Sequence, residues 1–273
     1  MSAGHAPIRL AVDPANPGQF FACCGVLELA ERLFGSAEGW FQQGAFHVNT
    51  NGGLFEILSA LVESEPDEIG EAAVGVPVKR LIAPLRLCLG NGRGNSITLD
   101  SWMVVRLEKG EPVALANPPW NFWSGQQTSG RIWRDLRAAF ALQLTKIAPE
   151  QLENLFFERA LLSGRFGFDP GPAWNALDVG FSPNEQGIDV ASSAAVELLA
   201  AVGVQRFRPN MHEDRQSFSY ATWGKPLPPC VAAAAACGVV LVRPLALYRG
   251  RVISRGSYAA LGRSALVHGD SHV

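Results

Sequence analysis

Apolar residues recur at helical spacing along several stretches of the chain. The clearest are residues 20–34 (FFACCGVLELAERLF) and 131–144 (RIWRDLRAAFALQL), where an apolar side chain returns every three or four positions. Residues 53–64 and 193–204 show the same period, and the alanine-rich stretch 228–238 is typical of a short buried helix. The pattern therefore predicts five helices.

Turn residues precede the first of these helices. The segment DPANPG (13–18) contains two prolines and a glycine, which end any earlier element. The helix that follows contains small side chains, among them Ala22, Cys23 and Cys24, which allow close packing. We therefore expect a tightly packed entry into a buried helix.

Strand-like patterns begin near residue 76. The run LRLCL (85–89) alternates leucine with Arg and Cys, and the run SITLDSWMVVRLEKG (96–110) continues as strand. The glycines between them do not fit the G-x-G-x-x-G sequence that opens a helix in dinucleotide-binding folds. We expect instead a β-hairpin near residues 80–106, with Arg93 near its tip.

Further strands are predicted at residues 205–210, 216–224 and 239–256, and an acidic segment at 63–71 is expected to be a mobile insertion. Helices and strands do not alternate regularly, which favours an α+β fold over a doubly wound sheet. No linker is visible. We expect one α+β domain over residues 1–273. A division of this domain into two lobes also fits the pattern.

Charge is distributed unevenly along the 273 residues. Residues 1–78, which include the acidic helical part expected at 1–75, carry two basic and ten acidic side chains, a net charge of −8. Residues 198–273 carry nine basic and three acidic side chains, a net charge of +6. Within the mixed part, 76–273, the C-terminal quarter therefore suits a polyanionic partner, whereas the N-terminal quarter does not.

Composition narrows the class of protein. The apolar content of 48% is sufficient for a core, and no apolar run is long enough for a membrane span. The N-terminus lacks the pattern of a signal peptide, so we expect a cytoplasmic protein without a membrane contact. Five cysteines without C-x-x-C spacing are typical of reduced thiols.

Recognised catalytic motifs are missing. The chain has no Walker A lysine motif, no H-E-x-x-H and no G-x-S-x-G, so we expect no cofactor and no metal. His47, at the end of a predicted strand, is either structural or a general base in RNA cleavage.

Arginine, aromatic and amide side chains remain as candidate chemistry. Residues 120–134 combine stackable rings with donors for bases and phosphates, although a buried tryptophan pair explains the same string. Arginines in YRGRVISRGSYAALGR (248–263) would follow a phosphate backbone, or would lie on a solvated strand edge. The candidate nucleic-acid-binding residues are Arg93, Trp123, Gln126, Gln127, Arg131, Arg134, Arg137, Arg206, Arg208, Arg249, Arg251, Arg255 and Arg263.

Four segments resemble a known family. They are VDPANPGQFFACCGVLELAERL, WSGQQTSGRI, FGFDPGPAWNALDVGFSPNEQ and AAVELLAAVGVQRFRP, and they are similar to the small Csb-type CRISPR-associated subunits of type I-U (type I-G) effector operons. The resemblance implies a subunit of a Cascade surveillance complex, with CRISPR guide RNA, target DNA and other Cascade subunits as partners. It also implies a RAMP-type core that is RRM-like (ferredoxin-type), with helical insertions and a hairpin thumb, although the RAMP glycine-rich C-terminal loop is not identifiable.

Three functions are consistent with these observations. The first is a non-catalytic subunit whose arginines hold guide RNA or target DNA by the backbone, while base pairing supplies specificity. The second is a scaffold that contacts only other protein subunits through its acidic N-terminal part. The third is a metal-independent guide-RNA-processing ribonuclease that uses His47.

Overall fold

A computed structural model of the chain describes residues 7–90, 95–170, 191–238, 244–255 and 258–267. In this part of the chain, helices combine with small sheets whose strand pairs are antiparallel. The α+β class predicted from the sequence is confirmed.

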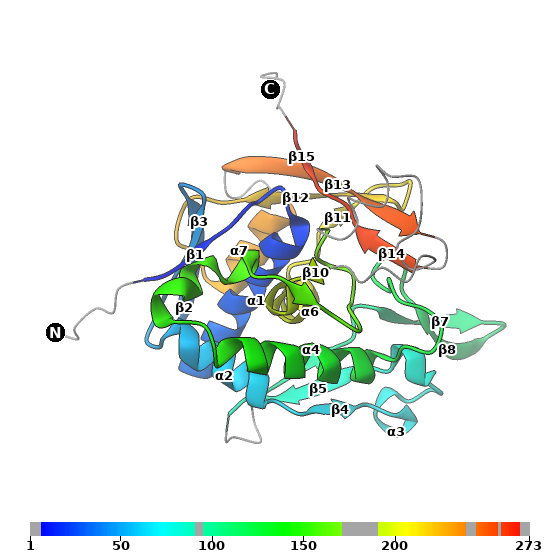
Figure 1. Ribbon diagram of the computed structural model, residues 1–273. Helices are drawn as coiled ribbons and strands as arrows, with labels where there is room; N and C mark the ends of the chain where they lie inside the picture. Colours follow the sequence, from blue (N-terminus) through cyan, green and yellow to red (C-terminus); the bar gives the residue numbers. More distant parts are fainter. Residues whose placement is uncertain (1–6, 91–94, 171–190, 239–243, 256–257, 268–273) are drawn as a thin grey trace.

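Two helices, α1 (Pro17–Phe34) and α6 (Ala194–Arg206), cross at the centre of the molecule (Figure 1). Glycines make this crossing close. A Cβ atom on Gly25 would lie 2.0 Å from the backbone oxygen of Leu199, and one on Gly203 would lie 2.0 Å from that of Phe21. Only hydrogen fits at either position, so the two backbones are in contact.

Burial of α1 is nearly complete. Every residue from Pro17 to Ala30 is buried, including Cys23 and Cys24. The turn residues expected before the helix are present, because the Asn16 side chain accepts the Gln19 N–H and caps its N-terminus. The predicted packed entry into a buried helix is confirmed.

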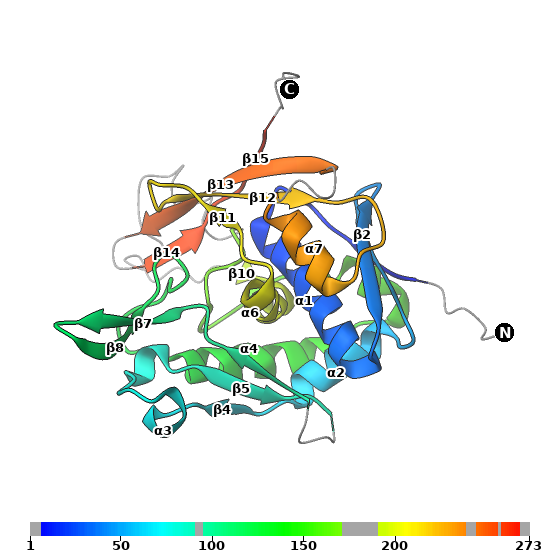
Figure 2. The ribbon, with the colours of Figure 1, turned by 180° about the vertical axis from the view of Figure 1, so that it is seen from behind.

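A five-stranded sheet covers one side of the central helix pair (Figures 1 and 2). Its long strand β13 (Ala246–Arg255) pairs with three neighbours. The other strands are β11 (Asn210–Met211), β12 (Ser217–Thr222), β14 (Tyr258–Leu261) and β15 (Ala265–Leu266).

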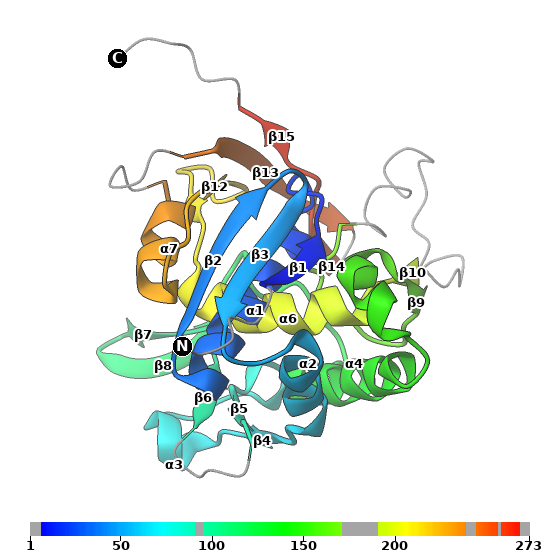
Figure 3. The same ribbon diagram turned by 90° about the vertical axis from the view of Figure 1, so that its left-hand side faces the viewer.

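A second sheet, ordered β1 (Ile8–Ala11), β3 (Ala45–Thr50), β2 (Ala37–Gln42), flanks α1 (Figure 3). With α1 and α2 (Leu54–Glu63), it follows the β-α-β-β-α order with which a ferredoxin-type fold begins. The next strand, however, does not pair with β1. The 3-10 helix η2 (Pro149–Phe157) packs against β1. Among the described residues, this sheet therefore lacks the fourth ferredoxin strand that the resemblance implies.

A third layer lies on the other side of the helix pair. It contains α4 (Ser129–Leu144) and the sheet β4-β5-β6, beside which the hairpin β7-β8 projects (Figure 2). The hairpin predicted near residues 80–106 is confirmed as β5 and β6, but Arg93 at its tip lies outside the described residues. The remaining bounds are β4 (Pro66–Glu68), α3 (Glu71–Val74), η1 (Arg80–Ile82), β5 (Leu85–Cys88), β6 (Ser96–Leu99), β7 (Met103–Glu108), β8 (Glu111–Ala116), β9 (Ala160–Leu161), β10 (Ala191–Ser192) and α7 (Pro229–Ala236).

Three expectations about elements are wrong. Residues 96–110 do not continue as one strand, because β6 ends at Leu99 and β7, which begins at Met103, pairs with β8. The acidic segment 63–71 is no insertion, because β4 within it pairs with β5 as the outer strand of a sheet. Residues 205–210 do not form a strand, because α6 continues to Arg206 and β11 begins at Asn210. No helix in the described part of the chain is long and apolar enough to cross a membrane.

Candidate nucleic-acid interface

Strand β12 is buried along its length except for the half-buried Ser219, whereas its partner β13 carries exposed side chains. Phe218 and Tyr220 of β12 are fully buried, and the Tyr220 ring lies 4.4 Å from that of Phe20 on α1. Intervening side chains project from the opposite face. On that face Ser217 pairs with Arg251, and Ser219 pairs with Arg249.

Arg249 and Arg251 are exposed and lie two residues apart on one strand. Within the described chain, neither guanidinium has a hydrogen-bond or ion-pair partner. Arg255 is the last residue of the same strand, four residues beyond Arg251. The strand therefore presents the side chains of Arg249 and Arg251 to solvent.

Small polar groups adjoin the two arginines. His212 lies just beyond β11, and its Nε2 atom is 2.7 Å from the Ser219 hydroxyl oxygen. We call the set His212, Ser219, Arg249 and Arg251 the arginine face; Ser217 beside it is buried. The imidazole and the Ser219 hydroxyl, which are bonded to each other, place polar groups beside the cations.

One carboxylate borders the arginine face. Asp214 accepts hydrogen bonds from the Ser217 hydroxyl and from the backbone N–H groups of Gln216 and Ser217. These bonds, the hydroxyl first, lower the pKa of Asp214 to about 2. The carboxylate is thus held within its own turn by local donors.

Most of the other predicted arginines are engaged in ion pairs. On α4, Arg134 pairs with Glu68 at 2.9 Å and Arg137 pairs with Glu65. The acidic segment, expected to be mobile, thus lies along the flank of α4 and neutralises it. This arrangement corrects the prediction that these arginines are open to a polyanion.

The remaining arginines divide between paired and open positions. Arg131 lies 3.8 Å from Asp135, Arg206 bonds the buried Glu28, and Arg263 bonds Asp13 at 2.5 Å. The Glu28 bond raises the pKa of Arg206 further. Arg208 is exposed, and its side chain has no partner in the described part of the chain.

The tryptophan-rich segment is not a stacking surface. Trp123 is buried, its Nε1–H donates to the Leu81 carbonyl at 3.0 Å, and its ring packs edge-on against Trp102. The alternative explanation, a buried tryptophan, is the right one. Gln126 is exposed and Gln127 half-buried, away from any contact with the arginine face that the structure records.

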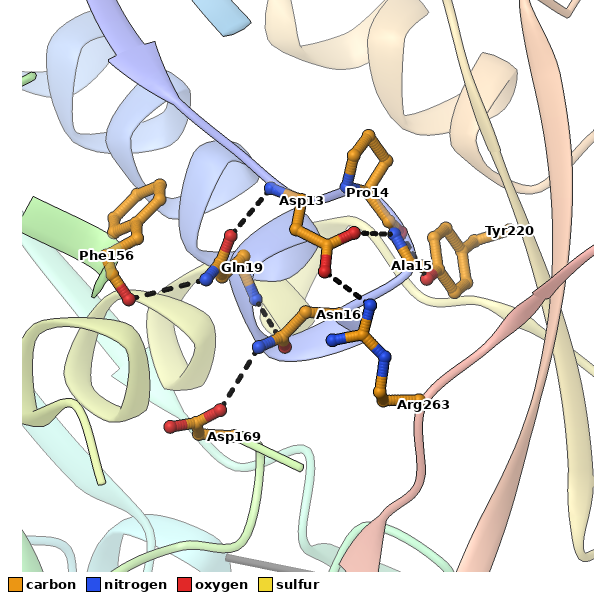
Figure 4. A network of polar contacts seen from close by, with 9 residues as sticks. All are labelled: Asp13, Pro14, Ala15, Asn16, Gln19, Phe156, Asp169, Tyr220 and Arg263. Atoms are coloured by element: carbon orange, nitrogen blue, oxygen red, sulfur yellow. Dashed lines mark hydrogen bonds and ion pairs between the residues drawn. The ribbon is translucent and has the colours of Figure 1, made fainter. Parts of the chain in front are cut away.

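A buried polar junction accounts for the opening segment instead (Figure 4). Asp13 accepts from Arg263, and its backbone N–H donates to Gln19 at 2.7 Å. The Asn16 amide donates to Asp169 at 3.1 Å. These bonds connect the start of α1 to chain segments more than 150 residues away.

Glu197 completes this junction, and the sequence analysis missed it. Its carboxylate accepts the backbone N–H groups of residues 166–169 at 2.9–3.3 Å, while Asp169 accepts from Ser192 and Ser193 at the start of α6. Burial raises the pKa of Glu197 to about 7. A lone carboxylate inside the apolar run AAVELLAAV was the available signal.

The described groups of this junction have structural partners. Its carboxylates are saturated by backbone and side-chain donors that hold segments together. Among the described residues, no three His, Cys, Asp or Glu side chains are grouped to hold a metal ion. The junction therefore acts as a structural joint between the N-termini of α1 and α6.

Comparison with known proteins gives no further guide to function, since no family model, no curated protein and no solved structure matches the chain.

Proposed function

We propose that this protein is a non-catalytic subunit of a CRISPR RNA-guided DNA surveillance (Cascade) complex and that its arginine face holds the backbone of guide RNA or target DNA. Two observations support the proposal. The arginine face carries open cations in the basic quarter of the chain, and four segments resemble Csb-type subunits.

The main support for nucleic-acid binding comes from Arg249 and Arg251. Elsewhere, Arg134, Arg137 and Arg263 have carboxylate partners, so a phosphate would have to displace an existing ion pair. Arg249 and Arg251 are exposed and have no carboxylate partner among the residues that the structure describes. A guanidinium forms paired hydrogen bonds with phosphate oxygens, which favours this surface for a polyanion.

Strand geometry suits a nucleic-acid backbone. Residues two apart on a strand rise by about 7 Å and point the same way. Arg249 and Arg251 would therefore contact successive phosphates of one strand and carry no sequence information themselves. Specificity would come from guide pairing.

Salt-titrated binding to an RNA oligonucleotide tests the proposal. Each lost phosphate contact on a single strand reduces the slope of log K against log salt by about 0.7. The double variant Arg249→Ala/Arg251→Ala should therefore bind more weakly, with a slope smaller by about 1.4. Arg134→Ala/Arg137→Ala removes the same charge from α4 and serves as the matched control.

The control should retain the wild-type slope, because its arginines are already paired. Equal slopes in wild type and the Arg249/Arg251 variant, with both proteins folded by circular dichroism, would contradict the proposal. Loss of complex assembly without any change in RNA affinity would favour the scaffold function instead.

A further inference from the structure

The solvent face of the β1-β3-β2 sheet differs in chemistry from the arginine face. Along β2, Ala37 and Phe41 are buried and the alternate residues Glu38 and Trp40 face outward. In register, Trp40 lies opposite His47, and Glu38 lies opposite Asn49. A carboxylate, an amide and two aromatic rings therefore share one surface.

The two rings form a stacked pair. The Trp40 and His47 ring centroids lie 5.2 Å apart, with an angle of 11° between the planes. The Trp40 Nε1–H donates to Gln42 at 3.3 Å, which holds the indole in place. Trp40 is partly buried.

Nearby positive charge is weak. Burial, and then the charge of Arg9, lower the pKa of His47, so its ring is neutral at physiological pH. Arg9, on the far side of His47, is bound to Glu153. The Trp40 side of the sheet therefore does not repel a cation.

A pocket of about 310 Å³ opens beside this surface, where β2 begins and β3 ends. Glu31, Glu38, Asn49 and Asn51 provide most of its polar lining, and none of its lining residues is basic. Its volume is at the lower limit for small-ligand pockets and suits one side chain better than a nucleotide.

We propose that this pocket and Trp40 bind an arginine or lysine side chain from a basic segment of a partner protein. We choose a basic side chain as the ligand because its charge is complementary to that of the pocket. The pocket is lined by two carboxylates, Glu31 and Glu38, and by no basic residue, which disfavours phosphate. Trp40 supplies the aromatic ring that attracts cations most strongly. The proposal is independent of the arginine face.

Titration of the full chain with the peptide Gly-Arg-Gly-Arg-Gly tests this inference. The indole N–H signal of Trp40, assigned by its loss in Trp40→Phe, should shift saturably in NMR spectra. Glu38→Gln should weaken binding about threefold, the size of an exposed ion pair. Trp40→Phe lacks this signal, so its affinity is measured by calorimetry beside that of the wild type. The variant should bind about twofold more weakly, because phenylalanine attracts cations less than tryptophan does.

Glu111→Gln, on the exposed hairpin β7-β8, removes one carboxylate elsewhere and should bind the peptide like the wild type. A peptide with glutamate in place of arginine should cause no saturable shift. Because Glu38 is exposed, its variant tests the pocket without disturbing the core.

Three results would overturn the inference: no saturation by the arginine peptide, equal affinity of Glu38→Gln and wild type, or a shift of the Trp40 signal by oligouridylate instead. The Arg249→Ala/Arg251→Ala variant should bind the peptide unchanged. Failure of RNA binding and failure of peptide binding are therefore separate outcomes.

Discussion

Glu197 places a fully buried carboxyl group in the first turn of α6, where it holds residues 166–169 against the helix. Its pKa is about 7 in the folded protein and ordinarily 4.5. Between these values the unfolded chain loses the proton first, so the unfolded state binds fewer protons. The stability contributed by this group is complete below pH 4.5 and declines as pH rises to 7.

We therefore predict that Glu197→Gln removes a pH-dependent part of the stability. The wild type should lose about 3 kcal/mol from this group between pH 4.5 and 7. The variant should be less stable throughout acid pH, because an amide presents one oxygen to four N–H donors. Urea unfolding of both proteins at pH 5, 6, 7 and 8 measures the difference, and parallel curves would contradict the prediction.

The sequence predicts only in part which arginines are ion-paired and which are open to solvent. Alternation along β13 is visible in the sequence and correctly suggested a row of arginines on a strand. The partners of Arg134 and Arg137 lie 66 and 72 positions away, and that of Arg263 lies 250 away. Partners so far apart in the sequence leave no local pattern. The neutralised arginines therefore could not be distinguished from the open ones.

The element on which the fold depends most is the crossing of α1 and α6. We predict that Gly25→Ala destabilises the protein by about 3 kcal/mol, the upper range for overpacking, because its methyl group would meet the Leu199 carbonyl. Gly70→Ala is the control, since a Cβ there has no atom within 4 Å. Thermal unfolding of both variants measures the effect. Similar melting temperatures for the two would show that the helices separate at little cost.

Sequence periodicity predicted the helices well and their arrangement poorly. The apolar stripe of α4, with Ile132, Leu136 and Phe140 buried, follows the expected spacing. The boundary of α6 was wrong because Gln205 and Arg206 continue the helix, where Gln205 bonds to the backbone N–H groups of Asp100 and Ser101. Tertiary contacts of this kind override local propensity.

At the scale of the whole molecule, α1 connects the two sheets on which the proposed binding surfaces lie. The β1-β3-β2 sheet and the five-stranded sheet both contact α1, the first through Phe41 and the second through Tyr220, which each pack against Phe20. A protein that binds a polyanion on one sheet and a basic protein segment on the other would thus connect two kinds of partner.

This shared core predicts cooperative unfolding of the chain. Buried residues from β1 to β14 form one continuous cluster, with Trp133 in the α4 layer and Trp223 beside the five-stranded sheet. Urea transitions followed by tryptophan fluorescence and by far-UV circular dichroism should therefore coincide. In Gly25→Ala both transitions should move to lower urea together, because the crossing is common to all layers. Two lobes would give separate transitions, of which the variant shifts only one.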